Sequence, residues 1–582
     1  MGIYNEDALR ILEQRYLLKN AAGEAIESPE DMLYRVSKTA AAVEKDRAYW
    51  EDTFFNVMAG HRFLPNSPTL ANAGLSRGQL SACFVLPISD SLEGIFETMK
   101  KAALVHKTGG GTGFSFSPVR PKGDIVTSTG GVASGPVSFI KAFNCVTDAV
   151  KQGGMRRGAN MAILDYWHPD ILEFINMKAE ENVLTNFNIS VGVDTRFMNQ
   201  VINGGDIDQI NPRTSKSNGT TISAAVLFDA MTYAAWANGE PGILFLDNIN
   251  KANTVPGCGL MNATNPCGEQ PLLDYESCNL GSLNLTAYLN KAGERYQERI
   301  NWSLLAEDIA AAVRFLDNII DVNKYIFPEI EEITKGNRKI GLGVMGFADM
   351  LIDLGIPYAS EEALELIEVL MRFIRMKAME TSVALGREKE PFPNIDKSIY
   401  RGETIRNATV TTIAPTGTIS MLAGTSSGIE PLFGLSFFKE VLEGRRVYIS
   451  SRSFEEMARK RGFWSNDLMQ ELAHKGSLER IAGIPEHVRK VYATAFEISP
   501  QWHIKVQAAF QKHVDNAVSK TINFPARAAV EDIRSAYIMA WKSGLKGLTI
   551  YRNGSRSNQV LRFDSEDGNK AISPAGCYTC PE

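Results

Sequence analysis

The sequence is sparing with cysteine and histidine: 582 residues include only seven of each. So few cysteines exclude a secreted, disulfide-stapled scaffold and favour a cytoplasmic protein with a few working thiols. No run of about 18 apolar residues occurs, so we expect no membrane-spanning helix. The acidic start, residues 1–7, contains no apolar signal region.

Positive charge is also in short supply, because 61 Lys and Arg residues face 67 Asp and Glu residues, a net charge of −6. A nucleic-acid-binding protein would normally show a basic patch or stripe, so the charge balance argues against that class. Any phosphate-bearing ligand must therefore be bound by local donors. The glycine-rich run at residues 109–113 lacks a following Lys-Ser or Lys-Thr, so it is not a P-loop.

The order of apolar segments predicts a helical N-terminal region over residues 1–60 and an α/β region over residues 61–555. From Asp564 the composition becomes polar and small, and residues 556–582 are predicted to form a flexible tail. Individual predictions are helices over Glu6–Lys19, Ala40–Met58 and Glu362–Leu385, and strands over Phe114–Phe116 and Gly242–Leu246.

The most informative segment is Asn265–Pro271, which reads Asn-Pro-Cys-Gly-Glu-Gln-Pro. In an extended backbone, alternate side chains share a face, so Asn265, Cys267 and Glu269 would project together. An amide, a thiol and a carboxylate side by side are typical of a reaction centre. A small buried cysteine in a tight turn is the alternative, and the segment alone does not decide between them.

Five further blocks accompany this segment, and together they resemble the ribonucleotide reductase family from about Asn5 to about Leu561. The blocks are Leu64–Leu70, Ser81–Val85, Gln152–Gly158, Ser277–Leu285 and Ala414–Ser420. The resemblance implies a ten-stranded α/β barrel with a finger loop at its centre, near residues 265–270. Residues 1–60 would be the family's helical cap, without the ATP-binding module that precedes it in many relatives.

The resemblance also implies roles for the polar residues of the finger loop. Cys267 would carry the thiyl radical, Glu269 would act as general base, and Asn265 would hydrogen-bond the sugar hydroxyls. Cys83 and Cys278 would supply the reducing electrons and form a disulfide in each turnover. Their Cα atoms must then lie within roughly 7 Å of each other.

Substrate phosphates would be held, by the same resemblance, through backbone N–H groups and hydroxyls of the Ala414–Ser420 turn. The Ser67–Thr69 and Ser81 regions would assist. The predicted substrate-binding residues are Ser67, Thr69, Ser81, Ala82, Pro415, Thr416, Gly417, Thr418 and Ser420. Whether the substrate is a diphosphate or a triphosphate stays open.

A second nucleotide, a dNTP or ATP, would bind as allosteric effector at Asp90, Arg120 and Arg156. Residues 127–135 and 152–160 would be the two flexible loops that connect effector and substrate, with glycines that permit a change of shape. The alternative for the second loop is a glycine-rich turn with a solvated arginine pair. The resemblance further implies a homodimer.

Three branches of the family differ in the source of the radical. Tyr551 stands without a second tyrosine beside it, and Ser573–Glu582 lacks the Arg-Val-x-Gly-Tyr pattern of glycyl-radical enzymes. Tyr551–Arg556 and Leu9–Leu17 resemble the adenosylcobalamin-dependent branch. Adenosylcobalamin is therefore the expected cofactor, with no metal bound directly by the chain. A class I large subunit, which needs a metal-bearing radical partner, is the alternative.

Cys577 and Cys580 form a Cys-x-x-Cys pair in the tail, which suits disulfide exchange or half of a zinc site. The resemblance favours a mobile dithiol that re-reduces Cys83 and Cys278 and is itself reduced by a thioredoxin-like protein. Whether the tail ends before a zinc-binding segment stays open.

Two other classes of protein remain as alternatives. One is a catalytically silent nucleotide-binding regulator that kept the barrel, and the other is a radical-free thiol–disulfide oxidoreductase. The complete set of catalytic residues speaks against the first. The second would not need an Asn-Pro-Cys-Gly-Glu loop.

Overall fold

The computed structural model describes residues 4–76, 78–126, 130–151, 158–290, 292–293, 295–441, 445–475, 477–479, 481–556 and 561–562. Three helices form the N-terminal region: α1 (Glu6–Arg15), α2 (Pro29–Ala41) and α3 (Arg47–Ala59). The single helix predicted over Ala40–Met58 is therefore wrong. Helix α2 ends at Ala41. A new helix, α3, begins at Arg47, because the Asp46 side chain caps it by accepting a hydrogen bond from the backbone N–H of Tyr49.

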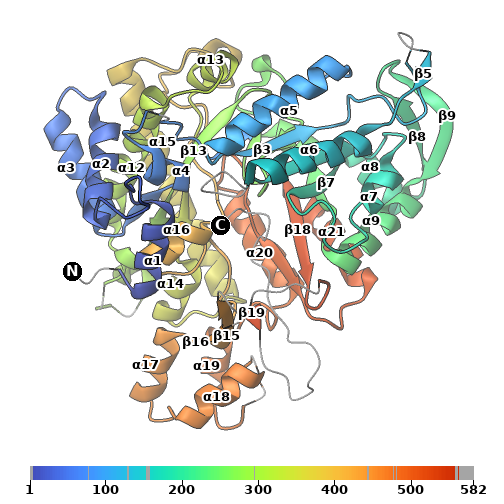
Figure 1. The fold of residues 1–582 in the computed structure, drawn as a ribbon. Helices are drawn as coiled ribbons and strands as arrows, with labels where there is room; N and C mark the ends of the chain where they lie inside the picture. Colours follow the sequence, from blue (N-terminus) through green and yellow to red (C-terminus); the bar gives the residue numbers. More distant parts are fainter. Residues whose placement is uncertain are drawn as a thin grey trace.

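A ten-stranded mixed sheet is the centre of the molecule (Figure 1), as the resemblance predicted. In order across the sheet, the strands are β1 (Phe63–Pro65), β13 (Ser277–Asn284), β2 (Cys83–Val85), β3 (Gly111–Ser115), β6 (Asn160–Asp165), β7 (Phe187–Val193), β10 (Gly242–Phe245), β18 (Gly547–Arg552) and β17 (Thr521–Phe524), with β14 (Ile340–Met345) beside β13. The run β2-β3-β6-β7-β10 is parallel, and its two outer strands pair antiparallel with β13 and β18.

Isolated bridges bring the two edges of the sheet together. Leu342 of β14 pairs with Thr411, and Ile413 pairs with Val518, which lies just before β17. The segment 411–413 therefore lies between the last strands of the two edges and completes the barrel wall.

Helices surround the barrel, and strand alternation explains why. In β7, Phe187, Ile189 and Val191 are buried in a hydrophobic cluster with the outer helices, so the intervening side chains face the lumen. The helices around the barrel include α5 (Leu92–Lys107), α6 (Pro136–Lys151), α9 (Ala224–Asn238), α12 (Trp302–Val322), α15 (Glu361–Lys389), α20 (Pro500–Gln511) and α21 (Val530–Lys542).

A small lobe lies at the bottom of Figure 1 and has a hydrophobic cluster of its own, which the sequence did not predict. It contains β15 (Ser436–Val441), β16 (Arg445–Ser450), α17 (Arg452–Lys460), α18 (Asn466–Lys475) and α19 (Glu486–Val491), and β19 (Leu561–Arg562) pairs with β15.

Shorter elements connect these layers. They are α4 (Ser67–Asn72), β4 (Ile125–Val126), β5 (Gly131–Val132), α7 (Ile171–Asn176), α8 (Thr195–Asn203), β8 (Asp206–Asn211), β9 (Lys216–Ser223), α10 (Leu246–Lys251), η1 (Pro256–Cys258), β11 (Ala263–Thr264), β12 (Pro271–Leu272), η2 (Leu285–Tyr288), α11 (Tyr296–Arg299), α13 (Pro328–Asn337), α14 (Phe347–Leu354), η3 (Ile395–Lys397) and α16 (Gly417–Ala423).

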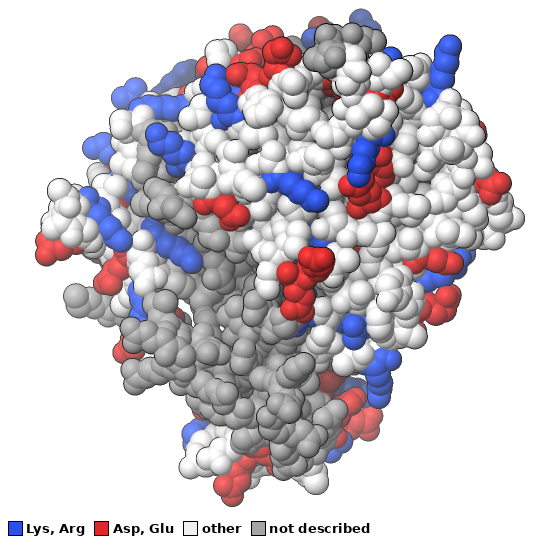
Figure 2. All heavy atoms as spheres, turned by 45° about the vertical axis from the view of Figure 1, so that its right-hand side comes forward, with Lys and Arg blue, Asp and Glu red and all other residues white. Residues whose placement is uncertain are grey.

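The surface agrees with the charge balance of the sequence. On the face drawn in Figure 2, blue and red side chains are interspersed over the described residues without a stripe of one sign. Within the described part of the chain, no helix is both long enough and apolar enough to cross a membrane.

Candidate active site

The finger loop is the tip of a short hairpin in which β11 pairs with β12. The backbone N–H of Asn265 donates to the carbonyl of Gln270 (3.2 Å), and the Asn265 side-chain oxygen accepts from the Gln270 N–H (3.0 Å). Gly268 has a φ of +79° and donates to the Asn265 carbonyl (3.1 Å). The extended backbone expected for residues 265–269 is therefore wrong, because the loop closes on itself as a hydrogen-bonded turn.

Two glycines of β3 make room for this loop inside the barrel. A Cβ atom added to Gly113 would lie 1.7 Å from the Thr264 carbonyl oxygen, and one added to Gly111 would lie 3.0 Å from the Pro266 ring. The glycine-rich run before and within β3 thus has a direct structural reason. It lets the backbone of the finger loop lie against the barrel wall.

The three polar side chains of the loop differ in exposure. Asn265 and Glu269 are buried, whereas Cys267 is partly exposed at the tip. The Asn265 side-chain amide donates to the sulfur of Cys83 (3.1 Å), so the loop reaches the wall strand that carries the predicted redox thiol. Cys267 is disulfide-bonded in this structure, and its thiol must be released before it can react.

Cys83 and Cys278 lie directly opposite each other on the antiparallel strands β2 and β13. Cα atoms of opposed residues in such a ladder are about 5 Å apart, so the pair meets the distance that a disulfide needs. The two sulfurs are not bonded to each other. Both side chains are almost completely buried, and burial, with a contribution from Glu276, raises the pKa of the Cys278 thiol well above its usual value.

A buried ion pair lies behind Cys278. Lys339, which immediately precedes β14, forms a 2.8 Å ion pair with Glu276, and neither side chain of the pair is exposed. Glu276 also accepts from the Leu273 N–H (2.9 Å) and from the Asn337 amide (2.7 Å). These bonds offset the cost of burying the carboxylate.

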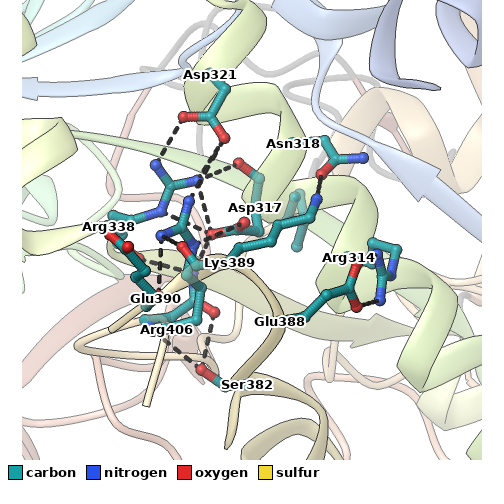
Figure 3. A network of polar contacts seen from close by, with 12 residues as sticks. Arg314, Asp317, Asn318, Asp321, Arg338, Ser382, Glu388, Lys389, Glu390 and Arg406 are labelled. Carbon is teal, nitrogen blue, oxygen red and sulfur yellow. Dashed lines mark hydrogen bonds and ion pairs between the residues drawn. The ribbon is translucent and has the colours of Figure 1, made fainter. Parts of the chain in front are cut away.

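The turn before β14 is held by the charged network drawn in Figure 3. Arg338 has a φ of +49° and donates to Asp317 (2.9 Å) and Asp321 (2.7 Å), which lie one helical turn apart on α12. Arg406 donates to the other oxygen of Asp317 (3.3 Å). This network fixes the position of Lys339, whose carbonyl oxygen lies 3.5 Å from the Cys278 sulfur.

The predicted phosphate segment lies at the start of α16, which packs against α1 and β1. Thr416 has a φ of +57° and accepts from the N–H of Gly428 (2.7 Å), while the Ser420 hydroxyl contacts that of Ser427 (3.0 Å). Gly417 is exposed, with open space beside its Cα atom, and Thr418 is half-buried. Two of the predicted hydroxyls therefore shape the loop.

The other predicted substrate residues surround this segment or the Cys83 strand. Ser67 begins α4, and its hydroxyl contacts that of Tyr16 (2.7 Å). Thr69 donates to the Leu80 carbonyl (3.0 Å), and Ser81 is buried beside Ser277 (3.3 Å). Ala82, before β2, donates to the Cys278 carbonyl (3.3 Å), and Pro415 is partly buried beside Thr416.

Two of the three predicted effector residues are in contact. The Arg120 guanidinium donates to both carboxylate oxygens of Asp90 (3.0 and 2.9 Å), and each side chain is about one-fifth exposed. Arg156 lies outside the described residues, as do residues 127–129 and 152–157 of the two predicted loops. Cys577 and Cys580 also lie outside them.

Several site residues were not predicted from the sequence. Asn188 of β7 donates its side-chain amide to the carbonyl of Pro266 (2.7 Å), and Thr412 donates to the carbonyl of Glu269 (3.0 Å). Only the period-two pattern of β7 could have placed Asn188 on the lumen face, and nothing local indicated its partner. Within the described residues, no group of three or more His, Cys, Asp or Glu could hold a metal ion.

Comparisons with known proteins cover nearly the whole chain. The family described as "Ribonucleotide reductase, barrel domain" matches residues 81–405 and 400–551, and "Ribonucleotide reductase, all-alpha domain" matches residues 4–78. The chain is 47% identical to the vitamin B12-dependent ribonucleoside-diphosphate reductase of Thermoplasma acidophilum, over 97% of this chain and 81% of that one. It is 48% identical to the enzyme of that name from Mycobacterium tuberculosis, over 96% and 79%.

A solved structure has the same fold. It is the class Id ribonucleotide reductase alpha subunit of Actinobacillus ureae, with a TM-score of 0.78, 23% identity, and coverage of 95% of this chain and 98% of that one. The family matches, the barrel with its finger loop and the opposed pair of cysteines agree: the chain belongs to the ribonucleotide reductase family.

Proposed function

We propose that this chain reduces ribonucleoside diphosphates to 2′-deoxyribonucleotides with adenosylcobalamin as cofactor. The observation that carries the proposal is the meeting of the Asn265–Glu269 turn with the opposed cysteines Cys83 and Cys278. Relatives at 47–48% identity bear the name of a vitamin B12-dependent ribonucleoside-diphosphate reductase. That name supports both the cofactor and the diphosphate form of the substrate.

The residues at the loop tip fit a radical source that approaches from outside. Cys267 and Gly268 are partly exposed, and a Cβ atom on Gly268 would meet nothing within 4 Å. When bound, adenosylcobalamin supplies the radical that converts the Cys267 thiol to a thiyl. The class I alternative has less support, because Tyr551 is followed by Arg552 and not by a second tyrosine. The Arg552 guanidinium lies 4.2 Å from the Trp236 ring centre.

The chain's own residues then divide the work on the sugar. Cys267 takes the 3′-hydrogen atom and later returns it, Glu269 takes the 3′-hydroxyl proton, and Asn265 hydrogen-bonds the hydroxyls. The 2′-hydroxyl leaves as water. Cys83 and Cys278 together give up two protons and two electrons and become a disulfide. Their burial keeps water away from both sulfurs.

Phosphates of the substrate are proposed to bind at Pro415–Thr418 and Ser420, with Ser67, Thr69, Ser81 and Ala82 shaping the pocket. Two features support this: Gly417 is exposed, and Thr416 beside it adopts a left-handed backbone conformation that turns the chain into α16. The effector, a dNTP or ATP, would bind at Asp90, Arg120 and Arg156. The Asp90–Arg120 contact supports this, since it keeps a carboxylate and a guanidinium together at a partly exposed position.

The partners follow from the same chemistry. Each turnover leaves a disulfide, so a thioredoxin-like reductant is proposed to act through Cys577 and Cys580, in the reducing cytoplasm. A homodimer is proposed through α5, which exposes Leu92, Phe96 and Leu104 on one side. Apolar side chains grouped in this way are typical of an interface.

The test is to reduce the purified chain with a dithiol and assay it with adenosylcobalamin and either CDP or CTP. We expect dCDP from CDP without a second protein. The Cys267→Ser variant should form no product, because a serine O–H bond is too strong to supply the radical. Activity that appears only with a metal-loaded radical subunit would move the chain to the class I alternative.

A further inference from the structure

Hydrogen bonds attach the tip of the finger loop to the barrel wall on each side of Cys267. On one side, the Pro266 carbonyl accepts from the Asn188 amide of β7 (2.7 Å). On the other, the Glu269 carbonyl accepts from the Ala517 N–H (2.9 Å) and from the Thr412 hydroxyl (3.0 Å). The reactive cysteine therefore lies between two attachment points.

The Asn188 bond acts on the peptide next to Cys267. The carbonyl of Pro266 and the nitrogen of Cys267 belong to one planar peptide group. Pro266 itself has a ring-restricted φ, so the remaining freedom of this peptide is mainly a rotation of its plane. A hydrogen bond to the carbonyl oxygen fixes that rotation, and with it the direction in which Cys267 leaves the loop.

Strand β7 holds Asn188 firmly. Its neighbours Phe187 and Ile189 are buried on the opposite face, and the Ile189 N–H donates to Glu240 (3.1 Å), a buried carboxylate paired with Lys178 and Arg556. The amide donor is thus presented to the lumen by a rigid strand.

We propose that Asn188 is a positioning residue for Cys267, which sets the orientation of the reactive sulfur through the Pro266 carbonyl. This inference rests on the proposed role of Cys267. Asn188 need not contact the substrate, so its loss should affect the chemical step more than nucleotide binding.

The experiment compares Asn188→Leu, which removes the donor at similar size, with Asn188→Asp and a control, Ser190→Ala. Ser190 lies two residues along the same lumen face. We expect Asn188→Leu to lower kcat at least tenfold with KM within twofold, and Ser190→Ala to stay near wild type. Amide hydrogen exchange of residues 264–270 should accelerate in Asn188→Leu while Tm changes little.

Asn188→Asp gives the sharper readout. An ionised aspartate cannot donate to the Pro266 carbonyl, whereas a protonated one can. Its kcat relative to wild type should therefore rise as pH falls, and that of Asn188→Leu should not. If Asn188→Leu does not fold, this isosteric variant carries the test.

The proposal is overturned if the Asn188 variants keep kcat within twofold of wild type and leave exchange in residues 264–270 unchanged. Failure of the proposed function looks different. Wild-type enzyme would then form no deoxynucleotide, or Cys267→Ser would retain turnover, while the exchange experiment would still report whether Asn188 holds the loop.

Discussion

Replacing Gly113 by alanine tests how closely the finger loop depends on the wall of the barrel. The added Cβ atom would lie 1.7 Å from the Thr264 carbonyl oxygen, where contacts below 3.0 Å are essentially never seen. The loop or the strand must therefore move until this distance grows from 1.7 to at least 3.0 Å. The contact joins a Cβ atom to a backbone carbonyl oxygen, so no side-chain rotation can relieve it.

Thr264 is next to Asn265 and close in sequence to Cys267, so the displacement reaches the residue that we propose carries the radical. A misplacement of about 1 Å can cost on the order of 100-fold in rate. We expect Gly113→Ala to lower kcat by about that factor. Gly111→Ala should have a smaller effect, because its Cβ atom would lie 3.0 Å from the Pro266 ring, at the limit of tolerated contacts.

The assay is kcat and KM for CDP reduction, with Ser115→Ala as the control on the same face of β3. Substrate affinity measured by equilibrium binding separates a displaced loop from a lost pocket. A Gly113→Ala enzyme with wild-type kcat, or a larger effect at Gly111 than at Gly113, would refute the close fit between β3 and the loop.

Three further predictions concern other parts of the molecule. Cys278→Ser should block multiple turnover, and mass spectrometry after one turnover without reductant should find a Cys83–Cys278 disulfide in wild type; a bond between other cysteines would contradict it. Burial lowers the pKa of His106 to about 4, below its unfolded value of about 6.5. Between about pH 6.5 and about pH 4 the unfolded chain therefore binds more protons than the folded one. The free energy of unfolding falls as the pH is lowered through this range, by up to about 3 kcal/mol. Denaturant unfolding of His106→Gln should show a shallower loss over this pH range, and an unchanged slope would exclude His106 as the cause. Arg120→Ala should weaken dNTP binding at least fivefold in equilibrium dialysis; unchanged binding would remove Arg120 from the effector site.

Local sequence made Asn265, Cys267 and Glu269 candidates for the active site, because they lie at alternate positions of one short segment, and their roles stay predictions. Their conformation was not predicted. We expected an extended backbone, but the segment forms a turn. Gly268 adopts a positive φ, and the Asn265 side-chain oxygen accepts a hydrogen bond from the Gln270 N–H. Similarly, helical periodicity continued past Ala41, but the Asp46 cap divided the region into two helices.

Long-range pairing had to come from the family resemblance. Cys83 and Cys278 carry no signal of each other in the sequence, and only the antiparallel register of β2 and β13 brings them opposite. The lobe around β15 and β16 was not predicted either. Its strands and helices are short, and its hydrophobic cluster forms from segments that are weakly periodic when taken one at a time.

Asn188 and Gly113 show where reasoning from sequence reaches its limit. Alternation along β3 and β7 assigns both residues to the lumen face, but it does not say what the lumen contains. In a barrel filled by side chains, a lumen-facing glycine would leave a gap and a lumen-facing asparagine would lack a partner. Both fit because the backbone of Thr264–Pro266 lies against these two strands. The Thr264 carbonyl oxygen occupies the space that a side chain at position 113 would need, and the Pro266 carbonyl oxygen accepts the hydrogen bond from Asn188.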